Sequence, residues 1–156
     1  MVKKGMAAKK GLVNQQLTSL VSAKIVALRP STITNGAWIY AASPVQRLAE
    51  WEENSAGKRC VFRHKDAIDE AWLTIRRAVE AGRLPLAKVS TRLTAPRHAD
   101  THVICVYSRD WRDDAAITAA REVLRELRFT EELGYKRDIE TARGVYGTAA
   151  EWYRRA

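Results

Sequence analysis

The sequence predicts an α+β fold, because two segments with helical periodicity alternate with short runs rich in β-branched residues. The clearer helix is predicted over 66–81, where apolar side chains recur every three or four residues up to a stop at Gly82. A second helix is predicted over about 113–127. The run HVICVY at 102–107 is almost wholly apolar, so we expect it at the centre of a sheet.

The other elements follow in chain order. Residues 1–11 hold four lysines and two glycines and are expected to form a mobile basic arm. Residues 12–30 show helical spacing that Pro30 ends; this amphipathic helix could dock on the domain, pair with another chain or remain an appendage. One domain is expected over 37–147, followed by a tail at 148–156. Besides 102–107, its strands are predicted at 37–41, 59–63 and 87–92, with a closing strand pair at 134–138 and 144–147.

The net charge of +9 is unevenly distributed along the 156 residues. Residues 1–49 contain seven basic side chains and no acidic one, which leaves only +2 on residues 50–156. General basicity therefore does not define a nucleic-acid-binding domain here. Any specific anionic ligand must therefore be bound by a few basic side chains at particular positions, not by a general excess of positive charge.

The cysteines and histidines exclude several classes of site. Cys60 and Cys105 stand in apolar runs and are expected to be free core thiols of a reducing, cytoplasmic compartment. Their spacing from the three histidines matches no metal site, and no Gly-rich phosphate loop or nucleophile motif is present. No apolar run is long enough to span a membrane. We therefore expect no metal, no cofactor and no membrane partner.

Basic side chains at strand positions are the first candidate constellation. Lys88 and Arg92 would share one face of the third strand, since side chains repeat every two residues. Lys58, Lys136 and Arg137 also fall in predicted strands. If the helices leave that face uncovered, these cations could bind phosphate or carboxylate groups. The alternative is an ordinary solvated face on which each cation pairs with Asp or Glu.

Tryptophans form the second constellation. Trp72 lies on the apolar stripe of the 66–81 helix and is expected in the core. Trp38, Trp51 and Trp111 fall at strand ends or in loops, where an indole either seals the core edge or stacks on a planar ligand.

Several ordered motifs carry a family resemblance over roughly 37–147. They are WIYAASP, GKRCVF, a DEAW helix, AKVST, HVICVYSRDW and YKRDIETARGVYG. The chain resembles the family of unknown function typified by basophilic leukaemia expressed protein, whose bacterial members are often named putative phosphothreonine lyase domain protein. The resemblance implies a curved antiparallel sheet backed by helices, similar to the cap-binding translation initiation factor.

The lyase association implies β-elimination of phosphate from a phosphothreonine protein. Lys88 in AKVST would remove the Cα proton, its amine made less basic by nearby cations such as Arg92. The family's Lys-x-His motif supplies an acid, but Cys60 stands where that histidine would be. His98 or His102 would then have to be recruited. The phosphate would be held by Lys58, Arg92, Lys136 and Arg137.

The cap-binding association implies binding of a nucleotide or RNA without catalysis. Such a fold stacks a base between tryptophans while basic residues hold its phosphates, and Trp38 and Trp111 are the stacking candidates here. The lysine arm would add salt-sensitive phosphate contacts. The remaining alternative is a protein-interaction module with no ligand pocket.

Overall fold

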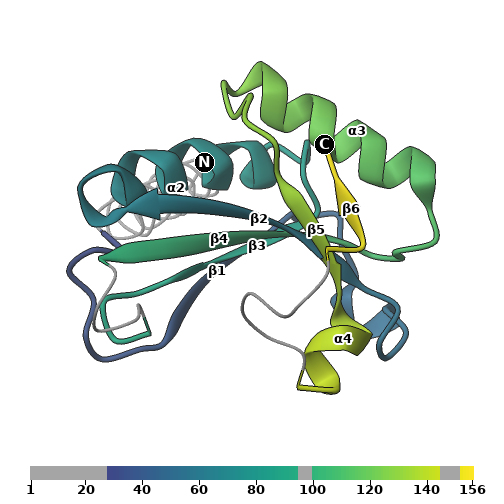
Figure 1. Ribbon diagram of the computed structural model, residues 1–156, viewed down its shortest axis with the longest axis horizontal. Coiled ribbons are helices and arrows are strands. Elements are labelled where there is room, and N and C mark those ends of the chain that lie inside the picture. The colour runs from purple at the N-terminus through teal and green to yellow at the C-terminus, as the bar shows by residue number, and fades with distance from the viewer. Residues whose placement is uncertain (1–27, 95–99, 145–151) are drawn as a thin grey trace, which may run out of the picture.

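Six strands form one antiparallel sheet, and two long helices lie against one of its faces (Figure 1). The computed structural model describes residues 28–94, 100–144 and 152–156. The elements are β1 (Trp38–Ala42), the 3-10 helix η1 (Leu48–Glu50), β2 (Gly57–His64), α2 (Lys65–Glu80), β3 (Leu86–Ser90), β4 (Thr101–Ser108), α3 (Asp114–Glu126), β5 (Gly134–Arg137), α4 (Asp138–Ala142) and β6 (Arg154–Arg155). The strand order is β1-β3-β4-β2-β5-β6, and every pairing is antiparallel.

This architecture confirms the predicted α+β class and the central position of β4, which lies between β3 and β2. The basic arm at 1–11 and most of the helix expected at 12–30 lie outside the described residues. Where the description begins, Leu28 and Arg29 have no regular structure and Pro30 opens a turn. Ser31 fixes this segment to α2, because its amide and hydroxyl both donate to the carboxylate of Asp69, at 3.0 and 2.6 Å.

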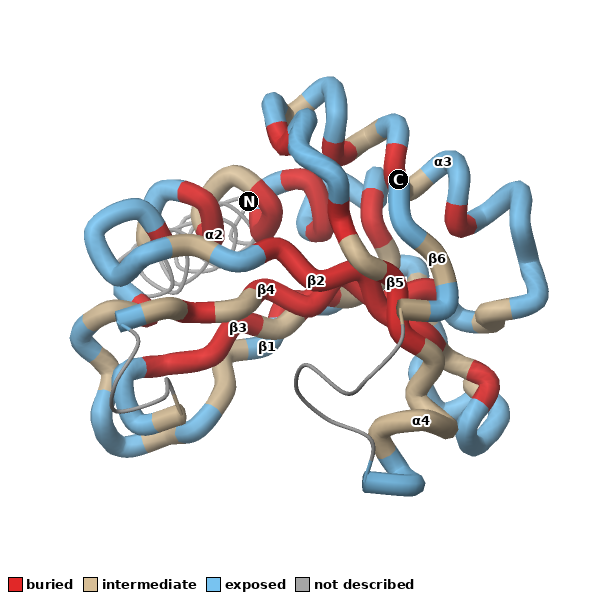
Figure 2. The backbone as a smooth tube through the Cα atoms, in the orientation of Figure 1, coloured by how far each residue is buried: buried red, intermediate tan, exposed pale blue. Residues whose placement is uncertain are grey.

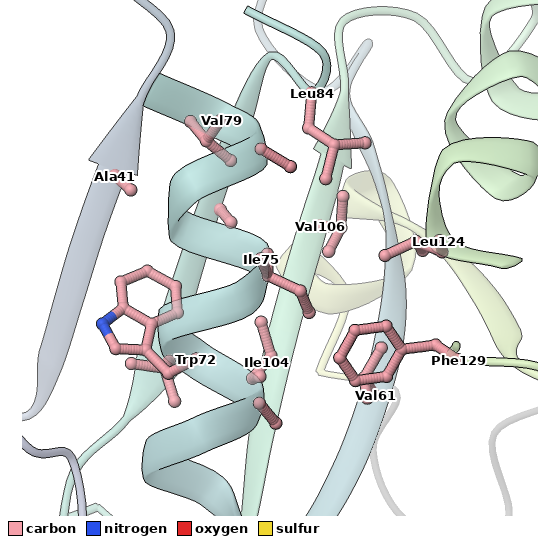
Figure 3. Packing of buried hydrophobic residues seen from close by; sticks show 14 of the residues in the cluster. Ala41, Val61, Trp72, Ile75, Val79, Leu84, Ile104, Val106, Leu124 and Phe129 are labelled. Atoms are coloured by element: carbon pink, nitrogen blue, oxygen red, sulfur yellow. The ribbon is translucent and has the colours of Figure 1, made fainter. Parts of the chain in front are cut away.

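Helix α2 buries the apolar stripe that its sequence predicts. Trp72 is 1% exposed and packs with Ile75 between the helix and the sheet (Figure 3). Gly82 ends the helical segment with a φ of +77°, a conformation that favours glycine. The helix begins at Lys65, one residue before the predicted start, because β2 runs directly into α2; His64 is the cap residue, and its Nδ1 accepts from the Asp66 amide.

Helix α3 begins one residue after its cap, Asp113, whose carboxylate accepts from the amide of Ala116. Ile117 and Leu124 are buried, as the apolar stripe predicts. Arg121 lies between them in sequence and is also buried, which the apolar pattern did not predict.

The main core lies between the two helices and the sheet. Figure 2 shows the buried residues concentrated along β4, β2 and β3 and on the helix sides that face them. Val61, Ile104 and Val106 contribute from the strands and meet Leu124 and Phe129 (Figure 3). Removing these apolar surfaces from water is the main force holding the helices on the sheet.

The carboxyl-terminal part of the fold differs from the prediction. Residues from Asp138 form the short helix α4, and β5 pairs with β2 on one side and with β6 on the other. The strand predicted at 144–147 lies, apart from Gly144, outside the described residues. Strand β6 comes from the segment expected to be a tail. It can approach closely because Gly134 has no Cβ: a methyl group there would lie 2.3 Å from the Trp152 ring. The stretch 145–151 lies outside the described residues.

Candidate functional site

The sheet face opposite α2 and α3 carries the predicted lysines. Ala87 and Val89 belong to the core on the helix side, so Lys88 between them points to the other side. We call this second side the open face. It is defined by the side chains of Trp38, Tyr40, Lys58, Cys60, Lys88, Cys105, Tyr107 and Lys136.

Strand register arranges these side chains in rows across the sheet. One row runs from Tyr40 through Lys88 and Cys105 to Cys60. The adjacent row runs from Leu86 through Tyr107 and Lys58 to Lys136. Residues from five strands are therefore brought onto one surface, with cations and aromatic rings as neighbours.

Lys88 lies at the centre of the aromatic part of the open face. Its Nζ atom is 4.1 Å from the centroid of the Trp38 ring and 5.8 Å from that of Tyr107. Both contacts are within the range of cation–π attraction. Burial lowers the pKa of Lys88 from its ordinary value, because the half-buried ammonium has lost part of its water. An anion nearby would therefore stabilise the charged form of Lys88.

Lys58 and Lys136 form the basic part of the open face. They are cross-strand partners, and both are buried. Lys58 donates to the Asp138 carboxylate at 2.9 Å, and its Nζ lies 5.5 Å from the Tyr107 ring centroid. Asp138 is the first residue of α4, so this short helix positions a carboxylate beside the lysines. The predicted meeting of Lys58, Lys88 and Lys136 on one face is thus observed.

The two cysteines are free and buried, as predicted, but they lie on the open face and not in the main core. Cys60 is opposite Cys105 in the register, and they pack with Tyr107. The hydrogen bond with Cys105, together with burial, raises the pKa of Cys60. Cys60 is therefore a poor replacement for the acid that a lyase requires.

Of the two histidines named as replacement acids, the structure describes only His102, which does not lie on the same side of the sheet as Lys88. His102 alternates with Val103 and shares the helix side with Ile104, and its Nδ1 is 2.8 Å from the Ser90 carbonyl oxygen. His98 lies outside the described residues. Within the described residues, neither Cys60 nor His102 is therefore suited to act as the acid beside Lys88.

Three predicted site residues lie elsewhere. β3 ends at Ser90, so Arg92 falls in an exposed turn, where its amide donates to the Pro30 carbonyl at 3.0 Å. Arg137 is in register with Gly57 on the other side of the sheet and pairs with Glu140 at 2.8 Å. The Arg137 guanidinium also lies 4.9 Å from the Trp111 ring. Trp111 and Arg137 therefore form a separate contact and do not face Lys88.

Two residues of this region were not among the predicted site residues, although Trp51 was named with Trp38 and Trp111 as an indole that seals the core edge or stacks on a ligand. Trp51, in the connection between β1 and β2, packs against the cluster of Tyr107 and the cysteines. Its Nε1 is buried and has no hydrogen-bond partner within the described residues. Tyr107 could have been found from the sequence, because it lies two residues after Cys105 in the same strand and so shares its face of the sheet. Trp51 has no such signal, since it lies in an irregular connection.

Two further structural features bear on the expected partners. Within residues 28–94, 100–144 and 152–156, no three His, Cys, Asp or Glu side chains gather in a way that could hold a metal ion. In the same ranges, no helix has the length and apolar character needed to cross a membrane.

The fold is similar to that of several eIF4E proteins. It is similar to Caenorhabditis elegans eIF4E-3 in complex with the 4E-binding protein Mextli and a cap analog, with 17% identity, a TM-score of 0.62, and 91% of this chain and 80% of that chain covered. It is also similar to Ascaris suum eIF4E-3 with m7G cap (17% identity, TM-score 0.61, 88% and 78% covered). A schistosome eIF4E with m7GpppA and 4E-BP gives 12% identity, a TM-score of 0.63, and 89% and 80% covered. At these identities the similarity shows a shared fold.

Family membership is narrower than this fold class. Residues 39–142 match the family model of the basophilic leukemia-expressed protein Bles03, and the chain belongs to that family. The family and the fold that the sequence motifs implied are both confirmed.

Proposed function

We propose that the open face binds a nucleotide without catalysis: aromatic side chains contact the base, and Lys88, Lys58 and Lys136 contact the phosphates. The observation that carries this proposal is the position of the Lys88 ammonium, 4.1 Å from the Trp38 ring, on a sheet face that α2 and α3 leave uncovered. An aromatic ring can stack on the base of a nucleotide, and a cation beside it can bind the phosphates.

The aromatic groups suited to a base lie at the β1 edge of the open face. Trp38 is half-buried and therefore keeps a fixed position, while Tyr40 is 61% exposed in the same strand. A flat ring held in place loses little conformational freedom when a base stacks on it. We therefore assign the base to the side of β1.

The phosphates are assigned to the lysines, which follow in the direction of β2 and β5. Lys58 and Lys136 are neighbours across the strands, and Asp138 holds Lys58 in place. Charge-assisted hydrogen bonds from ammonium groups to phosphate oxygens are the contacts that we assign to this part of the open face. The related folds in complex with cap nucleotides support this class of ligand, although those nucleotides belong to other proteins.

Binding is preferred over phosphothreonine elimination for a chemical reason. Elimination needs a base and an acid on the same substrate. Lys88 has the lowered pKa of a possible base, but Cys60 is held protonated in a hydrogen bond and His102 is on the helix side. The comparisons with known structures give no support to the lyase reading.

The test is calorimetric titration of the full chain with guanosine triphosphate and with its N7-methylated form. We expect binding that weakens as salt concentration rises, because phosphate contacts displace counterions. The substitution Trp38→Ala should weaken binding by about tenfold or more, the loss expected for a stacked base. Lys88→Gln should weaken it to a similar extent through a lost charge-assisted contact.

The chain offers matched controls for both substitutions. Trp111 and Lys65 are of the same residue types but lie away from the open face, Lys65 paired with Asp100 at 3.2 Å. Trp111→Ala and Lys65→Gln should leave the affinity unchanged. If neither nucleotide binds, or if the control substitutions weaken binding as much as Trp38→Ala, the proposal is wrong.

A further inference from the structure

A second basic site lies on the helix side of the sheet, between α3 and the end of β6. It is a pocket of about 370 Å³, a volume within the range of small-molecule sites. Figure 1 shows β6 and α3 next to each other in this region. Five arginines line the pocket, together with one acidic side chain, Glu122.

Two of these arginines are buried at the base of the pocket. Arg59 is 5% exposed and Arg121 is 2% exposed. Within the described residues, neither guanidinium forms an ion pair with a carboxylate side chain. Arg59 donates to the Leu133 carbonyl at 2.8 Å. Arg121 donates to the carbonyls of Phe129 and Glu131, both at 2.7 Å, and to an oxygen of the Ala156 carboxylate at 2.9 Å. The carbonyl oxygen satisfies the Arg59 donor but does not cancel its charge.

The two buried charges also act on each other. Burial, together with repulsion from the nearby Arg121, lowers the pKa of Arg59 to about 10. Removing a charge from water without a counter-charge is costly, so this arrangement would be stabilised by an anion.

The other three arginines stand around the rim, each with one carboxylate partner. The pairs are Arg125 with Glu122, Arg154 with Asp114, and Arg155 with Glu132. All three carboxylates are more than half exposed, so the ion pairs are solvated and weak. The rim arginines can therefore exchange these partners for a ligand at little cost.

We propose that this pocket binds a phosphoryl group carrying two or more negative charges, as in a phosphate monoester or a diphosphate. Five guanidinium groups face four carboxylates, those of Glu122, Asp114, Glu132 and Ala156, and the first three are solvated and easily displaced, so the pocket can offer several guanidinium groups to one polyanion. Guanidinium groups match the geometry of phosphate oxygens through paired hydrogen bonds. The site is separate from the nucleotide site proposed above, because Arg59 and Lys58 are consecutive strand residues and point to opposite sides of the sheet.

The experiment titrates the full chain, labelled with ¹⁵N at arginine, with pyrophosphate at constant ionic strength. We expect the Nε resonance of Arg59 to shift in a saturable manner. The carboxylate-removing substitution Glu122→Gln should tighten pyrophosphate binding several-fold, because it frees Arg125 and removes a charge that repels the ligand. Arg125→Gln together with Arg154→Gln should weaken binding about tenfold or more.

The controls separate this site from other effects. Glu126→Gln lies on the same helix but frees Arg83, which does not line the pocket, so it should not change pyrophosphate affinity. Lys88→Gln, on the open face, should leave the Arg59 shift intact. The proposal is overturned if Arg59 shows no saturable shift in the unmodified chain, or if Lys88→Gln abolishes that shift. Since the rim arginines and Glu122 are surface residues, their substitution tests the site without removing the buried groups that hold the fold.

Discussion

The ammonium group of Lys88 is subject to two opposing effects: aromatic rings attract its positive charge, and burial disfavours it. The strand carries Lys88 onto the open face between Trp38 and Tyr107, which attract its charge through their ring faces. The same rings exclude water, and burial therefore lowers its pKa from the ordinary value of 10.5. We therefore expect the protonation state of Lys88 to depend on the pH and on whether an anionic ligand is bound.

This environment predicts a pH dependence of nucleotide affinity. Above about pH 8 the phosphates are fully ionised, so their own titration no longer changes the affinity. Only the protonated Lys88 attracts phosphate. Because its pKa is lowered, the charge is lost at a lower pH than for an ordinary lysine, and affinity should fall as pH rises through that lowered pKa. Calorimetry between about pH 8 and 10 measures this fall.

The matched variant is Lys88→Arg, which stays charged over this range. Its affinity should change less with pH than that of the unmodified chain. Parallel pH profiles for the two proteins would show that Lys88 does not titrate in contact with the phosphates.

At the same scale, the two-residue period of a strand predicted only which residues of one strand share a face, and the register between strands brings Lys58, Lys88 and Lys136 to the same side. The period failed for Arg92 because β3 ends two residues earlier, and the sequence does not show where hydrogen bonding to the neighbouring strand stops. It failed for Trp111 because the direction of a loop side chain depends on tertiary contacts, here with Tyr153 and Arg137.

At the scale of elements, β2 is the strand that connects both proposed sites. Its side chains alternate between Lys58 and Cys60 on the open face and Arg59 and Val61 on the helix side. Gly57 begins this strand where Tyr135 of β5 packs directly over it. The Tyr135 hydroxyl is hydrogen-bonded to Ser108 of β4, so the ring joins three strands.

Gly57→Ala is therefore expected to destabilise the fold. The added methyl group would lie 2.0 Å from the Tyr135 hydroxyl oxygen, and Tyr135 is too deeply buried to move aside freely. Overpacking of this kind costs about 1–3 kcal/mol of the free energy of unfolding, which urea denaturation measures. Gly36→Ala is the control, because no atom lies within 4 Å of its added Cβ. Equal losses in the two variants would mean that the Tyr135 contact is not the cause.

The elements themselves were predictable to different degrees. The stripes of α2 and α3 were visible because a repeat of apolar residues over three or more turns is a strong signal. β6 was not, since Arg154–Arg155 is a two-residue strand with no apolar pattern and is held by pairing with β5. Arg121 was missed because an arginine on a buried helix face depends on backbone oxygen acceptors from distant parts of the chain.

At the scale of the whole molecule, the sheet separates two basic surfaces with different chemistry. The open face combines lysines with aromatic rings, whereas the pocket by α3 combines arginines with carbonyl groups. The net charge of +9 does not reveal either one, because the seven charges of residues 1–49 dominate it. A protein partner for this chain, by its helix expected at 12–30 or otherwise, stays a prediction.

The central claim is that the nucleotide binds on the open face, and amide NMR of the ¹⁵N-labelled full chain during a titration with guanosine triphosphate tests it most directly. We predict saturable shifts concentrated in β1, β3 and β4, at Trp38, Lys88 and Tyr107, with those of α2 unchanged. Shifts confined to the helices, or no saturable shift in any of these strands, would contradict it.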